Sequence, residues 1–292
     1  MRAVMLTNYI LKCPIIIVKI VILLLLSISP AVIAHDDLTH RIHSLNSQLS
    51  QQPHSQHDIN LLVQSGKLKY KNKQYRAALH DLLQVLQLDT KHSDALYYAA
   101  QANFHLENYH SAEQQILRFY QQAKNQAGKI RAYQLLGDIH LAEQAIAEAV
   151  SFYQAALNLQ QQPRPNDFLH AALTAQKLPD QGQQLALTIL HQGINTLGAI
   201  SSLSDPAITL HLALKQYNQA IQLTDTLLSN AAGLRKALLL EKKAMIYQQL
   251  QQTSQVTHTQ HLALAAIKTL PQHKQHSPQV QALTARLTSK SF

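Results

Sequence analysis

The sequence contains little glycine, proline and cysteine, and it contains no tryptophan. Its 292 residues include seven Gly, nine Pro and one Cys. So few glycines and prolines cannot supply the many tight turns of an all-β sandwich or barrel, and a helical fold is therefore favoured. Only 14% of the residues are charged, whereas 46% are apolar. This composition allows one larger or two smaller domains with a hydrophobic core.

Sequence motifs of nucleophilic and phosphate-binding sites are also missing. The chain has no G-x-S-x-G, no glycine-rich loop that ends in Lys-Ser or Lys-Thr, and no G-x-G-x-x-G. It has neither H-E-x-x-H nor a C-x-x-C pair, and its scattered acids do not form an obvious general acid–base pair. We therefore expect no enzymatic activity and no obligatory cofactor.

The first 34 residues have the organisation of a secretory signal peptide. The first 19 residues contain no acid and three basic side chains: Arg2, Lys12 and Lys19. A nearly continuous apolar run, Ile20–Ile28, follows, and small residues precede a cleavage site after Ala34. Cleavage there would make His35 the N-terminus of a periplasmic protein without stable membrane insertion. The alternative is an uncleaved anchor at the inner membrane, because residues 14–34 are long enough to span a bilayer.

Removal of residues 1–34 would change the chemistry of the chain. It would lower the formal net charge from +9 to +6 and remove Cys13, the only cysteine. The remaining chain could then form no disulfide or thiolate metal site. Cys13 also precedes the apolar run instead of following it, so lipidation is not expected. The basic residues are scattered, which is typical of a solvated surface and does not indicate nucleic-acid binding.

The rest of the chain is organised as an internal repeat. A shift of 34 residues aligns Leu62–Gly66 with Leu96–Ala100 and Tyr75 with Tyr109. It also aligns Ala78 with Ala112, and further shifts of 34 to 37 residues reach equivalent positions in four more units. Six units therefore occupy residues 59–270, with expected bounds 59–92, 93–129, 130–166, 167–200, 201–236 and 237–270.

Each unit is predicted to be two antiparallel helices, A and B, joined by a short polar turn. In the first unit, Tyr75–Leu88 forms helix B, with Ala78, Leu79, Leu82, Leu83 and Leu86 at the spacing of one buried face. Small residues are expected where the two helices approach most closely, since larger side chains would separate them. These positions are Gly66, Ala78, Ala100, Ala112, Gly137, Ala149, Ala156, Ala186, Ala220 and Ala244.

This pattern resembles the tetratricopeptide repeat. The resemblance consists of small residues twelve positions apart, an aromatic residue three positions before the second, and the 34-residue period. The best match is Leu136-Gly137, Ala149, Tyr153 and Ala156-Leu157. The last three units depart from the pattern, with Thr174, Ile208 and Val256 at small-residue positions. The resemblance implies an all-α, right-handed α-solenoid of about six helix-turn-helix repeats, of an exported bacterial type.

The two ends of the array are expected to carry capping helices. Residues 35–58 are predicted to form a leading amphipathic helix, which includes Leu38 and Ile42 on one face, followed by a linker. Residues 271–292 are predicted to form a polar loop and a last helix that begins at Pro278. Terminal helices of this kind cover the exposed faces of the end repeats.

In the tetratricopeptide family the A helices line the concave groove in which ligands bind. The resemblance therefore implies a groove for a protein or peptide, lined by Val63, Lys67, Tyr70, Tyr97, Gln101, Phe104, Arg131, Gln134 and Asp138. Aromatic and arginine side chains are enriched at binding hot spots. In an alternative interpretation, Tyr97 and Phe104 pack between neighbouring repeats. Of the positions that hold a partner's C-terminal carboxylate in some family members, only Arg131 fits.

The resemblance therefore favours a non-enzymatic scaffold or assembly factor of the cell envelope, which binds a protein or peptide partner. One alternative is an accessory subunit of an envelope enzyme complex.

Histidine is unusually frequent, with 17 in the chain. This frequency suggests a second alternative, a metal-binding envelope protein that uses histidines near the expected N-terminus. The candidate ligands are His35, His40 and His43, of which the last two lie three residues apart on one helix face. Their spacing matches no known ligand motif, and histidine can also serve as ordinary polar surface.

Overall fold

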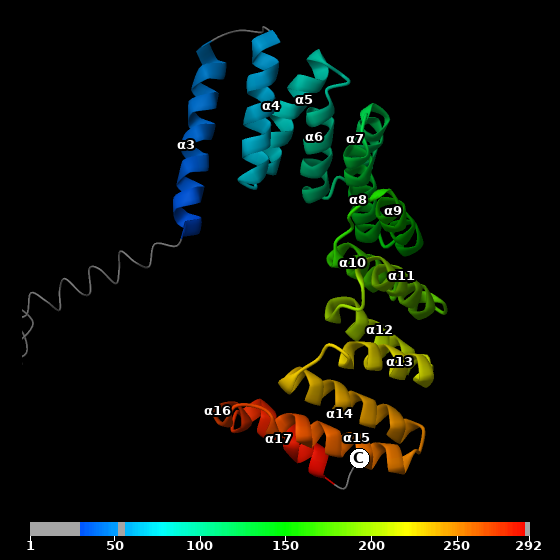
Figure 1. Cartoon of the computed structure of the whole chain (residues 1–292). Coiled ribbons are helices and arrows are strands. Elements are labelled where there is room, and N and C mark those ends of the chain that lie inside the picture. Colours follow the sequence, from blue (N-terminus) through cyan, green and yellow to red (C-terminus); the bar gives the residue numbers. More distant parts are fainter. Residues whose placement is uncertain (1–29, 52–55, 290–292) are drawn as a thin grey trace, which may run out of the picture. The chain divides into compact units, whose positions relative to one another are not determined.

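The computed structural model describes residues 30–51 and 56–289, and for 30–37, 50–51 and 56–58 it describes the backbone alone. This part of the chain consists of fifteen helices and contains no strand (Figure 1). The predicted all-α fold of helix-turn-helix repeats is confirmed. Residues 1–29, most of the predicted signal peptide, lie outside the described residues. No helix in the described ranges is long and apolar enough to cross a membrane.

The chain divides into two compact units, residues 1–124 and 125–292, which are described separately. The first unit contains α3 (Pro30–Gln51), α4 (Gln56–Lys71), α5 (Tyr75–Leu88), α6 (Ser93–His105) and α7 (Tyr109–Gln122). Here α4 packs against α5, α6 packs against α7, and α4 is also in contact with α6. The leading helix α3 packs against α4, and its Ile42 is buried.

The second unit contains four further helix pairs and two helices at its end. Its helices are α8 (Gln126–Ala142), α9 (Ile146–Leu159), α10 (Pro165–Ala175), α11 (Gly182–Leu197), α12 (Ser201–Ala213), α13 (Tyr217–Leu228), α14 (Gly233–Gln249), α15 (Thr253–Lys268), α16 (Gln272–Gln275) and α17 (Pro278–Thr288). One apolar core extends from α9 to α14. A second core joins α14, α15 and α17, in agreement with a terminal helix that covers the end of the stack.

Four expected repeat boundaries differ from the observed helix starts. The boundaries after residues 58, 129, 166 and 236 fall inside α4, α8, α10 and α14, because these helices begin two to four residues earlier. Local capping explains two of these starts. The Asn125 side chain accepts a hydrogen bond from the backbone N–H of Gly128 (2.8 Å). Pro165 begins α10, and the Asp167 carboxylate accepts a bond from the backbone N–H of Arg164 (3.0 Å).

The predicted helix B of the first repeat coincides with α5, Tyr75–Leu88. Ala78, Leu82 and Leu86 are buried, but Leu83 is 40% exposed, so its predicted place on the buried face is wrong. Val85 is fully buried instead, which shows that the buried face of α5 is rotated toward Asp81 and Val85.

The ten small residues at the predicted points of close approach are all buried. At Gly137 the helices approach closely, because an added Cβ atom would lie 2.4 Å from the Tyr153 ring. At Gly66 an added Cβ would lie 2.6 Å from Leu82 Cγ. Both distances are shorter than two carbon atoms tolerate, so these glycines allow the A and B helices to pack.

In each of the first three repeats, a side chain of helix A contacts a side chain of helix B at equivalent positions. The type of contact differs from repeat to repeat. In the first repeat the Lys69 ammonium donates to the buried Asp81 carboxylate (2.6 Å). In the second, the Asn103 amide donates to Gln115 (2.9 Å). In the third, the rings of His140 and Phe152 stack with centroids 5.1 Å apart. The repeat therefore conserves the geometry of this contact while its polarity varies.

Candidate functional site

A continuous group of rings lies on the A helices of the first unit and at the first residues of the B helices that follow them. This aromatic face consists of Tyr70, Tyr75, Tyr97, Tyr98, Phe104, His105 and Tyr109. Tyr70 on α4 and Tyr98 on α6 are 5.6 Å apart between ring centroids, and Tyr98 is 5.5 Å from Tyr97. Its tyrosines and Phe104 are half-buried and His105 is exposed. The rings are therefore held by packing against their neighbours and are still accessible to a partner.

Polar contacts fix the orientation of these rings. The Tyr70 hydroxyl lies 3.1 Å from His105 Nε2, and the two His105 and Tyr75 rings stack at 4.4 Å. Burial and the neighbouring tyrosines raise the pKa of Tyr70 to about 12, and burial lowers that of His105. Both groups are therefore neutral at pH 7, and this part of the aromatic face presents uncharged hydrogen-bonding groups.

Lys67 and Gln101 extend the aromatic face with polar groups. The Lys67 ammonium pairs with the Asp94 carboxylate and lies 5.4 Å from the centroid of the Tyr98 ring. The Gln101 amide donates to the Tyr97 hydroxyl (3.1 Å). Five predicted groove residues of the first unit therefore lie on one surface: Lys67, Tyr70, Tyr97, Gln101 and Phe104.

Val63, the sixth predicted groove residue of this unit, is 6% exposed and cannot contact a partner. Its assignment to the groove is wrong. The prediction assumed an A helix with one free face, but α4 packs against α3, α5 and α6. The ring of Tyr97 lies 5.1 Å from that of the buried Phe119, and the ring of Phe104 lies 6.0 Å from that of Tyr109. Both contacts are within the second repeat, so they do not support the alternative in which Tyr97 and Phe104 pack between neighbouring repeats.

The second unit holds a small polar cavity between the A helices α8 and α10. Its volume is about 250 Å³, and its lining includes the predicted residues Gln134 and Asp138 together with Tyr153, Gln160 and His170. The Tyr153 hydroxyl donates to Asp138 Oδ1 (2.7 Å). Gln160 Oε1 is buried and has no hydrogen-bond partner among the described residues. Arg131, the third groove residue predicted in this unit, is exposed on α8 and does not line the cavity.

Burial dominates the electrostatics of the Asp138–Tyr153 pair. It raises the pKa of the Asp138 carboxyl, while the hydrogen bond from Tyr153 and the nearby His170 act in the opposite direction. Burial and the Asp138 charge together raise the pKa of Tyr153. The lining of the cavity thus carries acceptors at Asp138 and Gln160 and a donor at Arg164.

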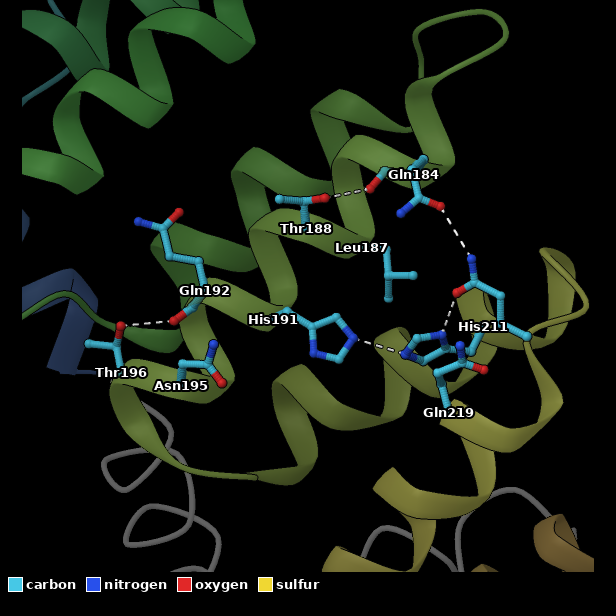
Figure 2. A pocket seen from close by; sticks show the side chains of 10 residues that line it. Gln184, Leu187, Thr188, His191, Gln192, Asn195, Thr196, His211 and Gln219 are labelled. Carbon is cyan, nitrogen blue, oxygen red and sulfur yellow. Dashed lines mark hydrogen bonds between the residues drawn. The ribbon is translucent and has the colours of Figure 1, made fainter.

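A larger cavity of about 680 Å³ lies between α11 and the A helix α12 (Figure 2). Two histidines face each other in its wall, with His191 Nε2 and His211 Nε2 2.9 Å apart. The sequence alone does not reveal this pair. The two residues are twenty positions apart on different helices and follow no spacing motif, so only the helix packing brings them together.

The structure does not bring together the described histidines that were proposed as metal ligands near the N-terminus into a group of three or more ligands. His40 and His43 are exposed on α3, and the side chain of His35 lies outside the described residues. Among the side chains that the structure does describe, no group of three or more His, Cys, Asp or Glu could hold a metal ion.

Comparison with known proteins supports the fold assignment. A family model described as anaphase-promoting complex, cyclosome, subunit 3 matches residues 38–119. No curated protein matches the sequence. The C-terminal part of a tetratricopeptide repeat-containing protein from Cytophaga hutchinsonii has a similar structure, with a TM-score of 0.60 and 12% identity. The match covers 85% of this chain and 94% of that one.

A second similar structure is that of Naa15/Naa10 bound to HypK-THB. Its TM-score is 0.56 at 14% identity, and the match covers 78% of this chain but 34% of that chain. At such low identity, both likenesses show the fold and nothing finer.

Proposed function

We propose that this chain, a tetratricopeptide-repeat protein by its fold, is a non-enzymatic scaffold or assembly factor of the cell envelope. It binds a partner protein or peptide through the aromatic face of its first unit. The observation that carries the proposal is this face, in which supported but accessible rings gather on neighbouring A helices. Exposed aromatic clusters of this kind mark interaction surfaces in soluble domains.

The rings are held in place before any partner arrives. Tyr70 contacts Tyr75, Tyr98 and His105, so a partner does not have to immobilise its side chain. Preorganised aromatic side chains lose little conformational entropy on binding and bring a large contact area. Lys67, already paired with Asp94, places a charged rim beside the rings. The face therefore combines an apolar centre with a polar border, the usual anatomy of a protein interface.

Two further observations support a scaffold without catalysis. The sequence lacks the nucleophile, phosphate-loop and metalloprotease motifs named above. A structurally similar chain comes from a structure described as Naa15/Naa10 bound to HypK-THB, and this place in an assembly supports a binding role. The identity of the partner distinguishes an assembly factor from an accessory subunit of an enzyme complex.

The envelope location belongs to the same proposal and rests on the sequence of residues 1–34. A basic leader, an apolar run and Val32-Ile33-Ala34 support export and cleavage before His35. Mass spectrometry of the protein purified from its native host tests this directly. A mature N-terminus at His35 is expected, and recovery of intact residues 1–34 in the cytoplasm would contradict export.

A crosslinked pull-down from envelope extract tests the binding face. The bait is the tagged natural chain, and Tyr98→Ser removes a ring at the centre of the aromatic face. Tyr247→Ser is a matched control, because the Lys243 ammonium lies over the Tyr247 ring at 5.6 Å, as Lys67 lies over Tyr98 at 5.4 Å. We expect one dominant partner, lost with Tyr98→Ser and kept with Tyr247→Ser. Equal recovery with both variants, at unchanged helical circular dichroism, would show that the partner binds elsewhere.

A further inference from the structure

The facing histidines of the second unit are oriented by a chain of amides. His211 Nδ1 lies 2.8 Å from Gln216 Oε1, and the Gln216 amide N–H donates to Gln184 Oε1 (3.4 Å). An amide oxygen can only accept a hydrogen bond, so Nδ1 of His211 carries the proton. In the neutral ring, Nε2 of His211 therefore presents its lone pair toward His191. This is the tautomer that a metal-binding imidazole requires.

His191 donates the hydrogen bond within this pair, because its Nε2 lies 2.9 Å from Nε2 of His211, which presents the lone pair. A metal ion can bind Nε2 of His191 once the proton of this neutral ring has moved to Nδ1. His211 is 3% exposed, whereas His191 is half-buried and lines the open cavity. An ion that enters the cavity can thus reach both Nε2 atoms.

We propose that Nε2 of His191 and Nε2 of His211 bind one divalent transition-metal ion of the imidazole-preferring class, such as zinc. Two nitrogens at bond lengths of about 2.0–2.1 Å from a tetrahedral zinc lie about 3.3 Å apart. The observed separation of 2.9 Å would have to grow by only a few tenths of an ångström. Rotation of the half-buried His191 side chain can supply this change without movement of the helices.

The protein supplies only part of the coordination sphere. The remaining lining of the cavity is Gln184, Leu187, Thr188, Gln192, Asn195, Thr196, Gln216 and Gln219, which carry no charge. Water or an anionic group from a second molecule therefore completes the coordination. The absence of carboxylates from this lining also disfavours calcium and magnesium, which prefer oxygen ligands.

This site is separate from the aromatic face and from the N-terminal histidines, so it does not depend on the proposed scaffold function. It also gives a distinctive readout. A metal held by His191 on α11 and His211 on α12 links two helices, and a ligand that binds only the folded state raises its thermal stability. A metal on neighbouring exposed histidines of one helix makes no such link.

Thermal unfolding of the natural chain with and without zinc chloride tests the proposal. His191→Gln removes one ligand but keeps an amide that can donate to His211. The matched control is His258→Gln, an exposed histidine on α15 of the same unit. We expect zinc to raise Tm by several degrees in the parent and in His258→Gln but not in His191→Gln. An equal rise in all three chains, or none in the parent, would overturn the proposal.

Isothermal titration with zinc chloride provides a second measurement. Zinc that binds to other histidines adds the same background in every variant. The number of bound zinc ions should fall by one in His191→Gln relative to His258→Gln. Gln216→Leu removes only the amide that orients His211 and should weaken the site by about 10–100-fold. An unchanged stoichiometry in His191→Gln would assign all zinc binding to other residues.

Discussion

At the scale of single residues, Gly137 shows how closely helix A and helix B approach in the third repeat. A Cβ atom at this position would lie 2.4 Å from one atom of the Tyr153 ring and 2.9 Å or less from two others. The Tyr153 ring cannot easily move away from this atom, because the ring is buried and its hydroxyl donates to Asp138 (2.7 Å). The glycine is therefore required by packing and not by an unusual backbone conformation, since it lies inside α8.

Gly137→Ala is expected to lower the free energy of unfolding by about 1–3 kcal/mol, the usual range for overpacking. Chemical denaturation measures this change. In a Tyr153→Leu background the ring is absent, and the same substitution should cost clearly less. Additive costs in the double variant would mean that the Tyr153 ring is not the obstacle.

Acid sensitivity is also expected at the residue scale, and it follows from His191. Burial and His211 lower the pKa of His191 in the folded chain, whereas an unfolded chain keeps a value of about 6.5. Below about pH 6.5 the unfolded chain binds a proton that the folded chain does not. The free energy of unfolding therefore falls as the pH falls from about 6.5 toward the lower pKa of the folded chain. Above pH 7 the contribution of His191 is fully retained.

Denaturation curves at pH 7.5 and pH 5.5 measure this loss of stability. The loss should be smaller in His191→Gln than in the parent, whereas His258→Gln should lose as much as the parent. If His191→Gln and the parent lose stability equally, His191 does not carry the acid sensitivity.

At the scale of elements, the turn between helix A and helix B repeats in atomic detail. One residue of every such turn has a positive φ: Lys73, Glu107, Gln144, Asp180, Lys215 and Gln251, with φ between 56° and 63°. In five repeats the next backbone N–H closes helix A by a bond to the carbonyl five residues earlier, as from Asn108 to Asn103 (2.9 Å). The fourth turn is the exception. It occupies Gln176–Gln181, because Pro179 disfavours continuation of α10 through Leu178.

These turns can be stabilised, because none of the six positive-φ residues is glycine. A left-handed conformation costs an L-residue about 1–2 kcal/mol. Glycine avoids this cost, but part of the gain is lost because glycine gives the unfolded chain more conformational entropy. Glu107→Gly should therefore raise the free energy of unfolding by about 0.5–1 kcal/mol, as measured by urea denaturation. Glu107→Ala removes the same charge but keeps the Cβ atom, so it should bring no such gain. An equal effect of both substitutions would point to charge and not to backbone strain.

The sequence was sufficient to predict features that depend on local spacing. The bounds of α5 followed from the short polar turn expected before Tyr75 and from the spacing of Ala78 and Leu82. Features that depend on packing between helices could not be predicted in this way. The burial of Val63 depends on the crowded position of α4 among three neighbours, and the His191–His211 contact depends on how α11 and α12 pack.

At the scale of the whole molecule, a repeat array is stabilised mainly by contacts between neighbouring helices. The terminal helix α17 covers α14 and α15 with three buried side chains, Val280, Leu283 and Leu287. Arg286 adds a pair of hydrogen bonds to the Glu241 carboxylate on α14 (2.6 and 3.1 Å). The apolar contacts are expected to dominate, because the Arg286 side chain is 54% exposed and water screens its charge.

Leu283→Ala should therefore destabilise the end of the array by about 2–5 kcal/mol, the range for a buried leucine. Because coupling in a repeat array passes between neighbours, the effect should be local. Hydrogen exchange should accelerate most in α14, α15 and α17, less in α10 and α11, and not in α4–α6. Leu262→Ala is the matched control, since this leucine of α15 is 44% exposed and its loss should change exchange little. Uniform acceleration across all helices in Leu283→Ala would show that the chain unfolds as one cooperative body and not repeat by repeat.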